Sequence, residues 1–262
     1  MADSTLLLDY EGLRQRVGFE LAFRRDSDAW TSEESAAVDD CVQSGIRQFY
    51  WPPPMQGVQH TWTFLKPTVV LALAASTSEV DLPDTCGGLE GQPTIETSAN
   101  YYRPLRVVGE GMIRRWRSES PSITGTPQCV AELPLQATGL SGQKFKLLLF
   151  PTTDIAYSLR CRYRVLPNMV TRAAGYPWGG AEHAETILAS CLAVAERRVK
   201  GEAGICQQAW LERLAASVAL DQRRTADFLG YAGDPGPRRR VDDGMRHRQN
   251  TADLYYNGTL LE

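Results

Sequence analysis

The residues suited to acid–base chemistry are few. The chain has three histidines, and His183, beside Glu182 and Glu185, is the best catalytic candidate among them. A general base needs an imidazole that a carboxylate or a similar group positions. Glu185 follows His183 by only two residues, whereas side chains on one helix meet at spacings of three or four. We therefore favour an interface or capping role for His183 over a catalytic or metal-binding one.

The short motifs of the common catalytic and nucleotide-binding sites are absent. The sequence contains no Gly-x-Gly-x-x-Gly, no phosphate-binding loop, no His-Glu-x-x-His and no Gly-x-Ser-x-Gly. Its six cysteines are scattered without a Cys-x-x-Cys pair, which favours reduced thiols packed as small hydrophobic residues over zinc ligands or a disulfide framework. We expect no catalytic residues, no cofactor and no metal ion, and hence a protein that is not an enzyme.

A row of arginines is the clearest charged feature. Arg160, Arg162 and Arg164 alternate with apolar residues through the segment 157–165, so a strand would place these cations on one face and the apolar residues on the other. A solvated sheet face is the interpretation that we favour. The alternative is an anionic partner, either the carboxylates of a neighbouring subunit or the phosphates of DNA.

Aromatic residues suggest two further kinds of binding. Trp116 lies within the cationic segment Arg114–Arg117 and could stack on a nucleic-acid base, although packing and subunit contacts are the more common role of such a segment. Trp62, Trp116 and Trp178 could instead stack on sugar rings, which defines a carbohydrate- or receptor-binding module as an alternative function.

The composition indicates an ordinary soluble globular chain. Apolar residues make up 43% of its 262 residues and charged residues 23%, with a net charge of −3. That charge excludes a globally basic nucleic-acid binder but leaves local basic segments possible. The longest strongly apolar run, 69–75, is too short to cross a bilayer, and we expect no signal peptide because no basic residues precede Leu6.

Two amphipathic helices are expected near the N-terminus. The spacing of Tyr10, Leu13 and Val17 predicts the first. The run Thr31-Ser-Glu-Glu34 then has the pattern of a capping box, which begins a second helix. Proline lacks the N–H donor that a helix needs, so the three prolines at 52–54 should end it.

The apolar period changes from 3.6 to 2 between about residues 60 and 175, which predicts a small antiparallel β-sandwich. Trp62 and Phe64 alternate with threonines and predict an aromatic strand at 60–64. The run 69–73 predicts a more buried strand, and 145–149 another with alternating burial. A short helix is expected near 110–117.

Helical periodicity returns at Ala181 and continues into a last helix at about 205–218. In that last helix we expect the following residues to point inward: Ile205, Ala209, Leu211, Leu214, Ala215 and Val218. All periodicity stops after Pro235. The remaining segment is polar and ends in apolar residues, a composition that suits an arm that orders on a partner.

Together these patterns predict an α+β fold. Residues 1–52 and 177–232 form an α-helical bundle built from the N- and C-terminal helices, residues 53–176 an inserted antiparallel β-sandwich-like domain, and residues 233–262 an extended C-terminal arm. We assign hinge and packing roles to the aromatic residues at the two ends of the insertion: Phe49, Tyr50, Trp51, Trp62, Tyr176 and Trp178.

An ordered set of segments resembles a known family. The set comprises Ile46–Pro54, His60–Phe64, Pro104–Val108, Tyr157–Leu166, Gly179–Glu185 and Leu229–Asp234. Taken in this order, it is similar to the head-to-tail adaptor (connector) proteins of long-tailed bacteriophages and phage-like gene transfer agents. The resemblance covers about residues 5–235 and is architectural. The large β module departs from it, since many adaptors have only the helical bundle.

The resemblance implies a structural virion protein at the head–tail junction, assembled in the host bacterial cytoplasm. In that family a ring, usually of twelve copies, docks beneath the portal protein, continues the DNA channel and receives the next neck, stopper or tail-terminator protein. Nonspecific contact with passing double-stranded DNA is implied, and no membrane partner. C-terminal arms commonly reach into the portal, which assigns portal contacts to these residues: Arg238, Arg239, Arg240, Arg246, Tyr255 and Tyr256. A carbohydrate- or receptor-binding virion module and a hydrolase that uses His183 are the alternatives.

Overall fold

The computed structural model describes residues 6–24, 26–55, 57–98, 101–135, 142–173, 175–225, 255–256 and 259–260. The chain divides into two compact units, residues 1–224 and 225–262. In the second unit, strand β9 (Tyr255–Tyr256) pairs antiparallel with β10 (Thr259–Leu260). The expected portal contacts at Arg238–Arg240 and Arg246 lie outside the described residues. The helices and the two larger sheets belong to the first unit.

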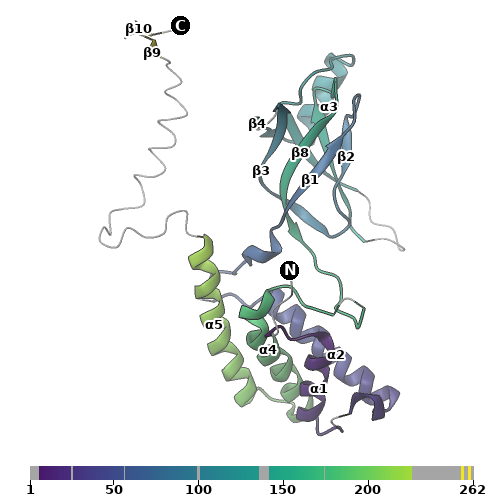
Figure 1. The fold of residues 1–262 in the computed structure, drawn as a ribbon, viewed down its shortest axis with the longest axis vertical. Coiled ribbons are helices and arrows are strands. Elements are labelled where there is room, and N and C mark those ends of the chain that lie inside the picture. The colour runs from purple at the N-terminus through teal and green to yellow at the C-terminus, as the bar shows by residue number, and fades with distance from the viewer. Residues whose placement is uncertain are drawn as a thin grey trace. The chain divides into compact units, whose positions relative to one another are not determined.

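Four helices share one hydrophobic core (Figure 1). They are α1 (Tyr10–Glu20), α2 (Ser32–Tyr50), α4 (Gly180–Lys200) and α5 (Ile205–Thr225), with a short 3₁₀ turn, η1 (Ser27–Ala29), between the first two. Helix α4 is the central member, because it packs against both α1 and α2 and hydrogen-bonds to α5 through Thr186 and Ser217. The expected bundle of N- and C-terminal helices is confirmed.

The start and end of α2 follow from its sequence. The capping box at its N-terminus is present: the Glu34 N–H donates to Thr31 Oγ1 at 3.2 Å, and the Thr31 N–H donates to Glu34 Oε2 at 2.8 Å. The helix ends at Tyr50, just before the three prolines.

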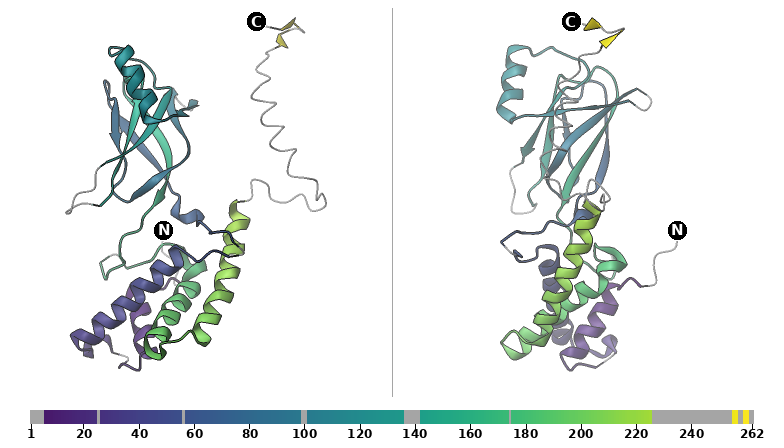
Figure 2. Two further views of the ribbon diagram at one scale, coloured as in Figure 1. Left: turned by 180° about the vertical axis from the view of Figure 1, so that it is seen from behind. Right: turned by 90° about the vertical axis from the view of Figure 1, so that its left-hand side faces the viewer.

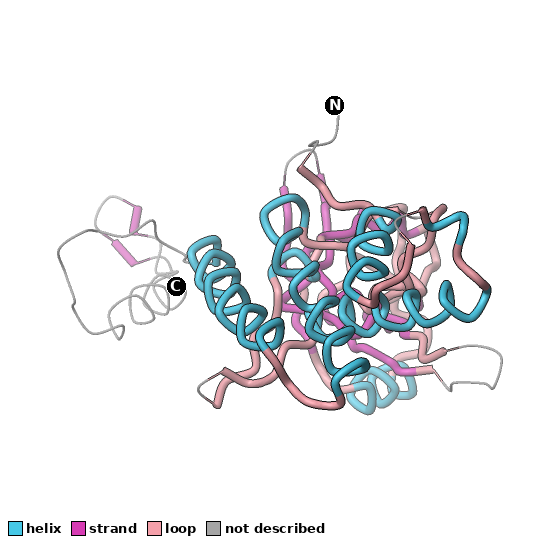
Figure 3. Tube along the Cα trace, turned by 90° about the horizontal axis from the view of Figure 1, so that it is seen from below, coloured by secondary structure: helices cyan, strands magenta, loops and turns pink. Residues whose placement is uncertain are grey.

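The contact between α2 and α4 depends on a glycine. A Cβ atom at Gly45 would lie 2.4 Å from the Cα atom of Cys191, so the two backbones approach too closely for any side chain at that position. Ser190 Oγ donates a hydrogen bond of 2.8 Å to the Gly45 carbonyl across the same contact. The two helices are thereby held in one register. Figure 3 shows the helices from below.

A buried carboxylate closes the turn from α4 to α5. Gly201 ends α4 in the left-handed conformation, with φ of 73°. Glu196, buried in the last turns of α4, accepts hydrogen bonds from the N–H groups of Cys206 and Gln207 at 2.8 and 3.4 Å. The first turn of α5 thus has its free donors capped by a side chain from the preceding helix.

The expected inward face of α5 is only partly right. Leu214 and Val218 are buried, together with Trp210, but Ile205 is 82% exposed and Leu211 is 42% exposed. One side of α5 packs on α4, and the helix has no neighbour on the side where Leu211 lies among the described residues. Apolar residues therefore occur on two sides of this helix, and the sequence pattern does not tell the packed side from the open one.

Two four-stranded sheets form the β part of the fold. One has the order β1-β8-β3-β4 and the other the order β2-β7-β6-β5 (Figures 1 and 2). Neighbouring strands are antiparallel except for the parallel pair β5 and β6. The strands are β1 (Thr68–Leu73), β2 (Glu79–Asp81), β3 (Cys86–Ser98), β4 (Tyr101–Pro104), β5 (Arg106–Val107), β6 (Cys129–Pro134), β7 (Phe145–Phe150) and β8 (Tyr157–Val165).

The two sheets enclose a second core. Leu159 and Ile95 from the first sheet and Leu147 and Leu149 from the second belong to one buried cluster. Strand β8 alternates strictly between buried and exposed residues, as its sequence predicts, and burial raises the pKa of the Cys161 thiol to about 11. The mixed α+β fold is confirmed.

One strand is covered on both faces. In β7 the alternation expected from the sequence fails, because Leu148 is buried along with Leu147 and Leu149. Helix α3 (Glu110–Glu119) lies on the outer face of that sheet (Figure 2), and its Ile113 packs against Leu148. The short helix is confirmed, and it explains the continuous apolar run.

The predicted aromatic strand at 60–64 is wrong. Thr63–Leu65 form a 3₁₀ turn, η2, and the preceding residues are irregular. Trp62 and Phe64 do not line one face of a sheet; both rings pack against Phe49 of α2. The expected buried strand at 69–73 does form within β1, but it is the edge of its sheet, so Val70 is exposed and only Leu73 is fully buried.

Replacing Gly45 by alanine should lower the free energy of unfolding by about 2–3 kcal/mol, because the new methyl group must push α2 and α4 apart. Chemical denaturation measures the change. Gly111 is the matched control: it lies in α3, and a Cβ there meets no atom within 4 Å. Gly111→Ala should leave stability unchanged or raise it slightly, since alanine is the better helix former. Equal losses in both variants would contradict the close-packing account.

Replacing Glu196 by glutamine should weaken the acid sensitivity of the fold. The ion pair with Lys200 and the two backbone hydrogen bonds hold the pKa of Glu196 below its usual value. A lowered folded-state pKa contributes stability above the unfolded-state pKa, and that stability disappears as the pH falls through the folded-state value. Denaturation at a series of pH values from neutral to acid should show lower stability of Glu196→Gln at neutral pH and a shallower decline below about pH 4.5. Glu202→Gln, in the exposed turn nearby, should behave as the wild type.

Candidate functional site

An aromatic cluster occupies the point where the chain leaves α2. The ring centroids of Phe49 and Trp62 lie 4.6 Å apart, and those of Trp62 and Phe64 5.3 Å apart. The Trp62 indole N–H donates to the Phe49 carbonyl at 2.7 Å, which satisfies that polar group inside the core. Trp62 is fully buried, so it cannot be a stacking platform for a sugar.

His183 belongs to this cluster. Its ring lies 5.2–5.9 Å from the rings of Trp62, Phe64 and Phe49, and the residue is 1% exposed. Glu185, two residues further along the helix, forms ion pairs with Arg213 of α5 at 2.9 Å and with Arg16 of α1 at 3.5 Å, as its unfavourable spacing from His183 suggests. An imidazole enclosed by aromatic rings cannot reach a substrate, so the geometry assigns His183 to packing.

The chain returns to the helices through the same cluster. Gly179 has φ of 122°, and a Cβ there would lie 3.5 Å from the rings of Phe49 and Phe64. The Trp178 N–H donates to the Tyr50 hydroxyl at 2.7 Å, and burial raises the pKa of Tyr50. The two ends of the β insertion are thus connected to each other through α2.

Three of the six aromatic residues assigned to the junctions lie at the surface. Trp51, Tyr176 and Trp178 are between 42% and 53% exposed, whereas Phe49, Tyr50 and Trp62 are buried. Trp51 also lines a small cleft of about 100 Å³ together with Met169. The remaining proposed sugar platform, Trp116, is half-buried against Phe150.

A buried aspartate connects α5 to the segment before β1. Asp221 is fully buried and accepts hydrogen bonds from the backbone N–H of Thr63 at 3.0 Å and from the Thr63 hydroxyl. His60 Nε2 lies 2.9 Å from the same carboxylate. This site was not predicted from the sequence. The sequence does contain a hint of it. Asp221 continues the apolar stripe of Leu214 and Val218 on α5, and a carboxylate buried at such a position needs hydrogen-bond partners.

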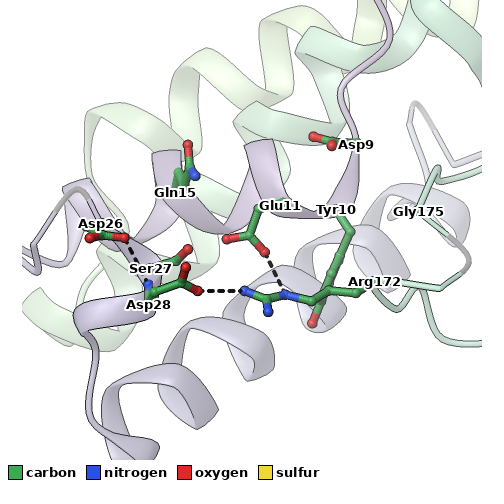
Figure 4. Close-up of a pocket in the computed structure, with 9 residues that line it drawn as sticks. All are labelled: Asp9, Tyr10, Glu11, Gln15, Asp26, Ser27, Asp28, Arg172 and Gly175. Carbon is green, nitrogen blue, oxygen red and sulfur yellow. Dashed lines mark hydrogen bonds and ion pairs between the residues drawn. The ribbon is translucent and has the colours of Figure 1, made fainter.

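A polar pocket of about 370 Å³ lies where the segment after β8 meets α1 (Figure 4). Arg172 bridges Glu11 at 3.0 Å and Asp28 at 3.6 Å. Burial acts to raise the pKa of Glu11, but hydrogen bonds from Ser27, Arg14 and Arg172 outweigh it and keep that pKa below its usual value. Arg172 thereby links the segment after β8 to α1 and η1.

The three arginines of β8 project from the exposed face of their sheet, as predicted. Arg160 lies over the ring of Tyr102, with its guanidinium carbon 4.8 Å from the ring centroid. Arg162 Nε donates to the Lys66 carbonyl at 2.8 Å, and Arg164 donates to the Gly87 carbonyl at 2.9 Å. These interactions orient the guanidiniums while all three side chains stay exposed.

An apolar groove of about 490 Å³ runs between α1 and α4. Leu188 and Leu192 form part of it, and Phe19 at its edge is 60% exposed. Exposed phenylalanine beside a groove is typical of a surface that contacts another protein. Phe19 was not predicted from the sequence as a functional residue.

Two other kinds of site are absent from the described part of the chain. No group of three histidine, cysteine or acidic side chains there could hold a metal ion. None of the described helices combines the length and the apolar character that a membrane span requires.

Comparison with known proteins identifies one family. The family described as SU10 adaptor protein matches residues 8–239. No curated protein sequence matches the chain.

Replacing Asp221 by asparagine should destabilise the fold by about 2–3 kcal/mol, the value of hydrogen bonds to a buried charged group. The substitution leaves the shape nearly unchanged but removes one of the two oxygens that face the donors of Thr63 and His60. Chemical denaturation gives the magnitude, and Arg223→Ala, on the exposed side of the same helix turn, is the control. If Asp221→Asn were as stable as the wild type, the hydrogen bonds of Asp221 would make no net contribution to the free energy of unfolding.

Proposed function

The chain belongs to the SU10 adaptor protein family and is therefore a structural protein of a phage virion, and we propose that it forms the ring that joins head to tail. The ring of twelve copies docks beneath the portal protein, continues the DNA channel and receives the neck, stopper or tail-terminator protein on its other side. The family match over most of the chain carries this proposal. It also implies association with other head–tail proteins and a structural rather than a catalytic role.

A ring of identical subunits requires two different surfaces on each subunit, because a head-to-tail contact closes by rotation. Two apolar surfaces of the bundle support this proposal. One is the groove between α1 and α4 with Phe19 at its edge. The other is the open side of α5, where Leu211 is exposed and lies away from the residues that pack on α4. Permanent interfaces of this kind bury on the order of 2,000 Å² or more, so these surfaces would form only part of the contact.

The domain division proposed from the sequence fits such a ring. Residues 1–52 and 177–232 would form the ring body, and the β insertion at 53–176 would extend from it. The cluster of Phe49, Trp62 and His183 supports the hinge role assigned to the junction, because it connects the two ends of the insertion with α2 and α4. The surface aromatics Trp51, Tyr176 and Trp178 would then face a neighbouring protein.

The C-terminal segment would supply the portal contact. Its arginines at 238–240 and 246 can pair with acidic groups of the portal, and Tyr255 and Tyr256 can pack into an apolar pocket. A segment that orders only on its partner adds interface area without enlarging the core of the subunit. Assembly in the host cytoplasm and insertion at the head–tail junction complete the proposal.

Mass measurement of the purified chain, alone and with the portal protein, tests the ring. We expect a closed oligomer, or a ring that forms on the portal, and we expect Phe19→Asp to abolish it by placing a charge in the groove contact. Arg24→Asp, on the exposed surface after α1, should leave the mass unchanged. Deletion of residues 236–262 should weaken portal docking and leave the helices folded. A strict monomer under both conditions would refute the proposed function.

A further inference from the structure

The cations of the β sheets fall into two groups. Most of them form an ion pair with a carboxylate on the same or a neighbouring strand or helix: Lys66, Arg114, Arg115, Arg117, Lys144 and Lys146. Arg160, Arg162 and Arg164 have no carboxylate within 4.0 Å among the described residues, although all three are exposed. Arg103 of β4 and Arg106 of β5 likewise have no carboxylate within this distance among the described residues, but each is the only such cation on its strand. A row of three uncompensated cations therefore occurs along β8.

Neutral groups hold each of these guanidiniums. Tyr102 stacks against Arg160, the Lys66 carbonyl accepts from Arg162, and the Gly87 carbonyl accepts from Arg164. Each interaction orients the planar guanidinium and uses only part of its five donors. No carboxylate neutralises these guanidiniums among the described residues, and all three residues are exposed. Their remaining N–H donors are available to a phosphate or carboxylate group.

The surroundings of the row contain little opposing charge. On β1, the residues opposite Arg162, Arg160 and Ser158 are Thr68, Val70 and Ala72, which are short and uncharged. On β3, Glu90 lies opposite Arg162 but binds Lys66 instead. Glu96 of β3 lies opposite Ser158, so the carboxylates that border the row are on its β3 side, and the β1 side has none at these positions. An anionic polymer can therefore approach the row from the β1 side.

We propose that Arg160, Arg162 and Arg164 form a binding site for the phosphate backbone of double-stranded DNA. Alternate residues of a strand are about 6.6–6.8 Å apart on one face, a spacing comparable to that of successive phosphates along one nucleic-acid strand. A regular row of exposed cations is complementary in charge to the regular row of phosphates of a polyanion. The site carries no base specificity, because it reaches only the backbone. This inference rests on the proposed function, since a subunit of a DNA channel meets DNA.

The salt dependence of DNA binding tests the site. The full chain is titrated against a labelled random-sequence duplex at several low salt concentrations. The logarithm of the binding constant should fall with the logarithm of the salt concentration, and Arg160→Gln/Arg162→Gln/Arg164→Gln should make that slope shallower by about 2.7, which is about 0.9 for each phosphate that an arginine no longer neutralises. The single variant Arg162→Gln should change it by about 0.9, and it serves if the triple variant does not fold.

The control removes the same charge from another surface. Arg114→Gln/Arg115→Gln/Lys144→Gln removes three exposed cations that carboxylates already compensate, so its slope should stay at the wild-type value. An equal change of the salt slope in both triple variants would overturn the proposal, because the net charge alone would then determine DNA binding. An unchanged slope in the β8 variant would overturn it as well, because β8 would then not contact the phosphates.

A parallel mass measurement separates this inference from the proposed ring. If the β8 variant loses the oligomer while its DNA slope is unchanged, the row is a subunit interface and the DNA proposal fails although the ring stands. If the wild-type chain is a monomer on and off the portal but shows the predicted slopes, the ring fails and the DNA site stands.

Discussion

The aromatic cluster around Phe49 and Trp62 is the interaction on which the two parts of the fold both depend. A chain that leaves a helical bundle for more than a hundred residues must return to the same place, or the last two helices cannot pack. Here Phe49 lies in the last turn of α2, and the rings of Trp62 and Phe64 pack against it. Gly179 and His183, at the start of α4, lie against the same rings. The burial of large aromatic rings supplies several kilocalories per mole. The cluster thus closes the long loop that the β insertion represents.

Polar groups strengthen the same junction from three sides. Tyr50 accepts the Trp178 N–H, Asp221 binds the segment at Thr63, and Arg172 joins the segment after β8 to α1. Each of these hydrogen bonds spans more than a hundred residues of sequence. Tyr50 and Asp221 are buried, whereas Arg172 is exposed. A buried polar group costs free energy unless its partner is in place, so Tyr50 and Asp221 favour one arrangement of the segments beside the helices over others with similar apolar burial.

The sequence predicts the regular elements well and the junctions poorly, for a physical reason. Helix α2 carries its own start and stop signals in Thr31, Glu34 and the prolines, and β8 carries an unbroken alternation, so both follow from local chemistry. The segment at Trp62 alternates like a strand, but none of the described strands pairs with it. The rings of Trp62 and Phe64 pack against Phe49 instead. Long-range packing decides such cases. The roles of Asp221 and Arg172 depend on the same packing and could not be read from spacing.

For the candidate site, the sequence identifies the types of residue but does not show which groups surround them in the fold. The sequence shows that Arg160, Arg162 and Arg164 share a face, and it shows that His183 has acidic neighbours. Only the structure shows that aromatic rings enclose His183 and that Glu185 pairs with Arg213 and Arg16. It also shows that the β8 arginines lack carboxylate partners among the described residues, whereas most other cations of the β part have them. A charge compensated within the subunit adds little to an encounter with another molecule, whereas an oriented and uncompensated charge is available to it. The features that distinguish this chain therefore lie on its surfaces, at the β8 face and the groove beside Phe19, and not in an enclosed pocket, as a protein that works by contact with larger assemblies requires.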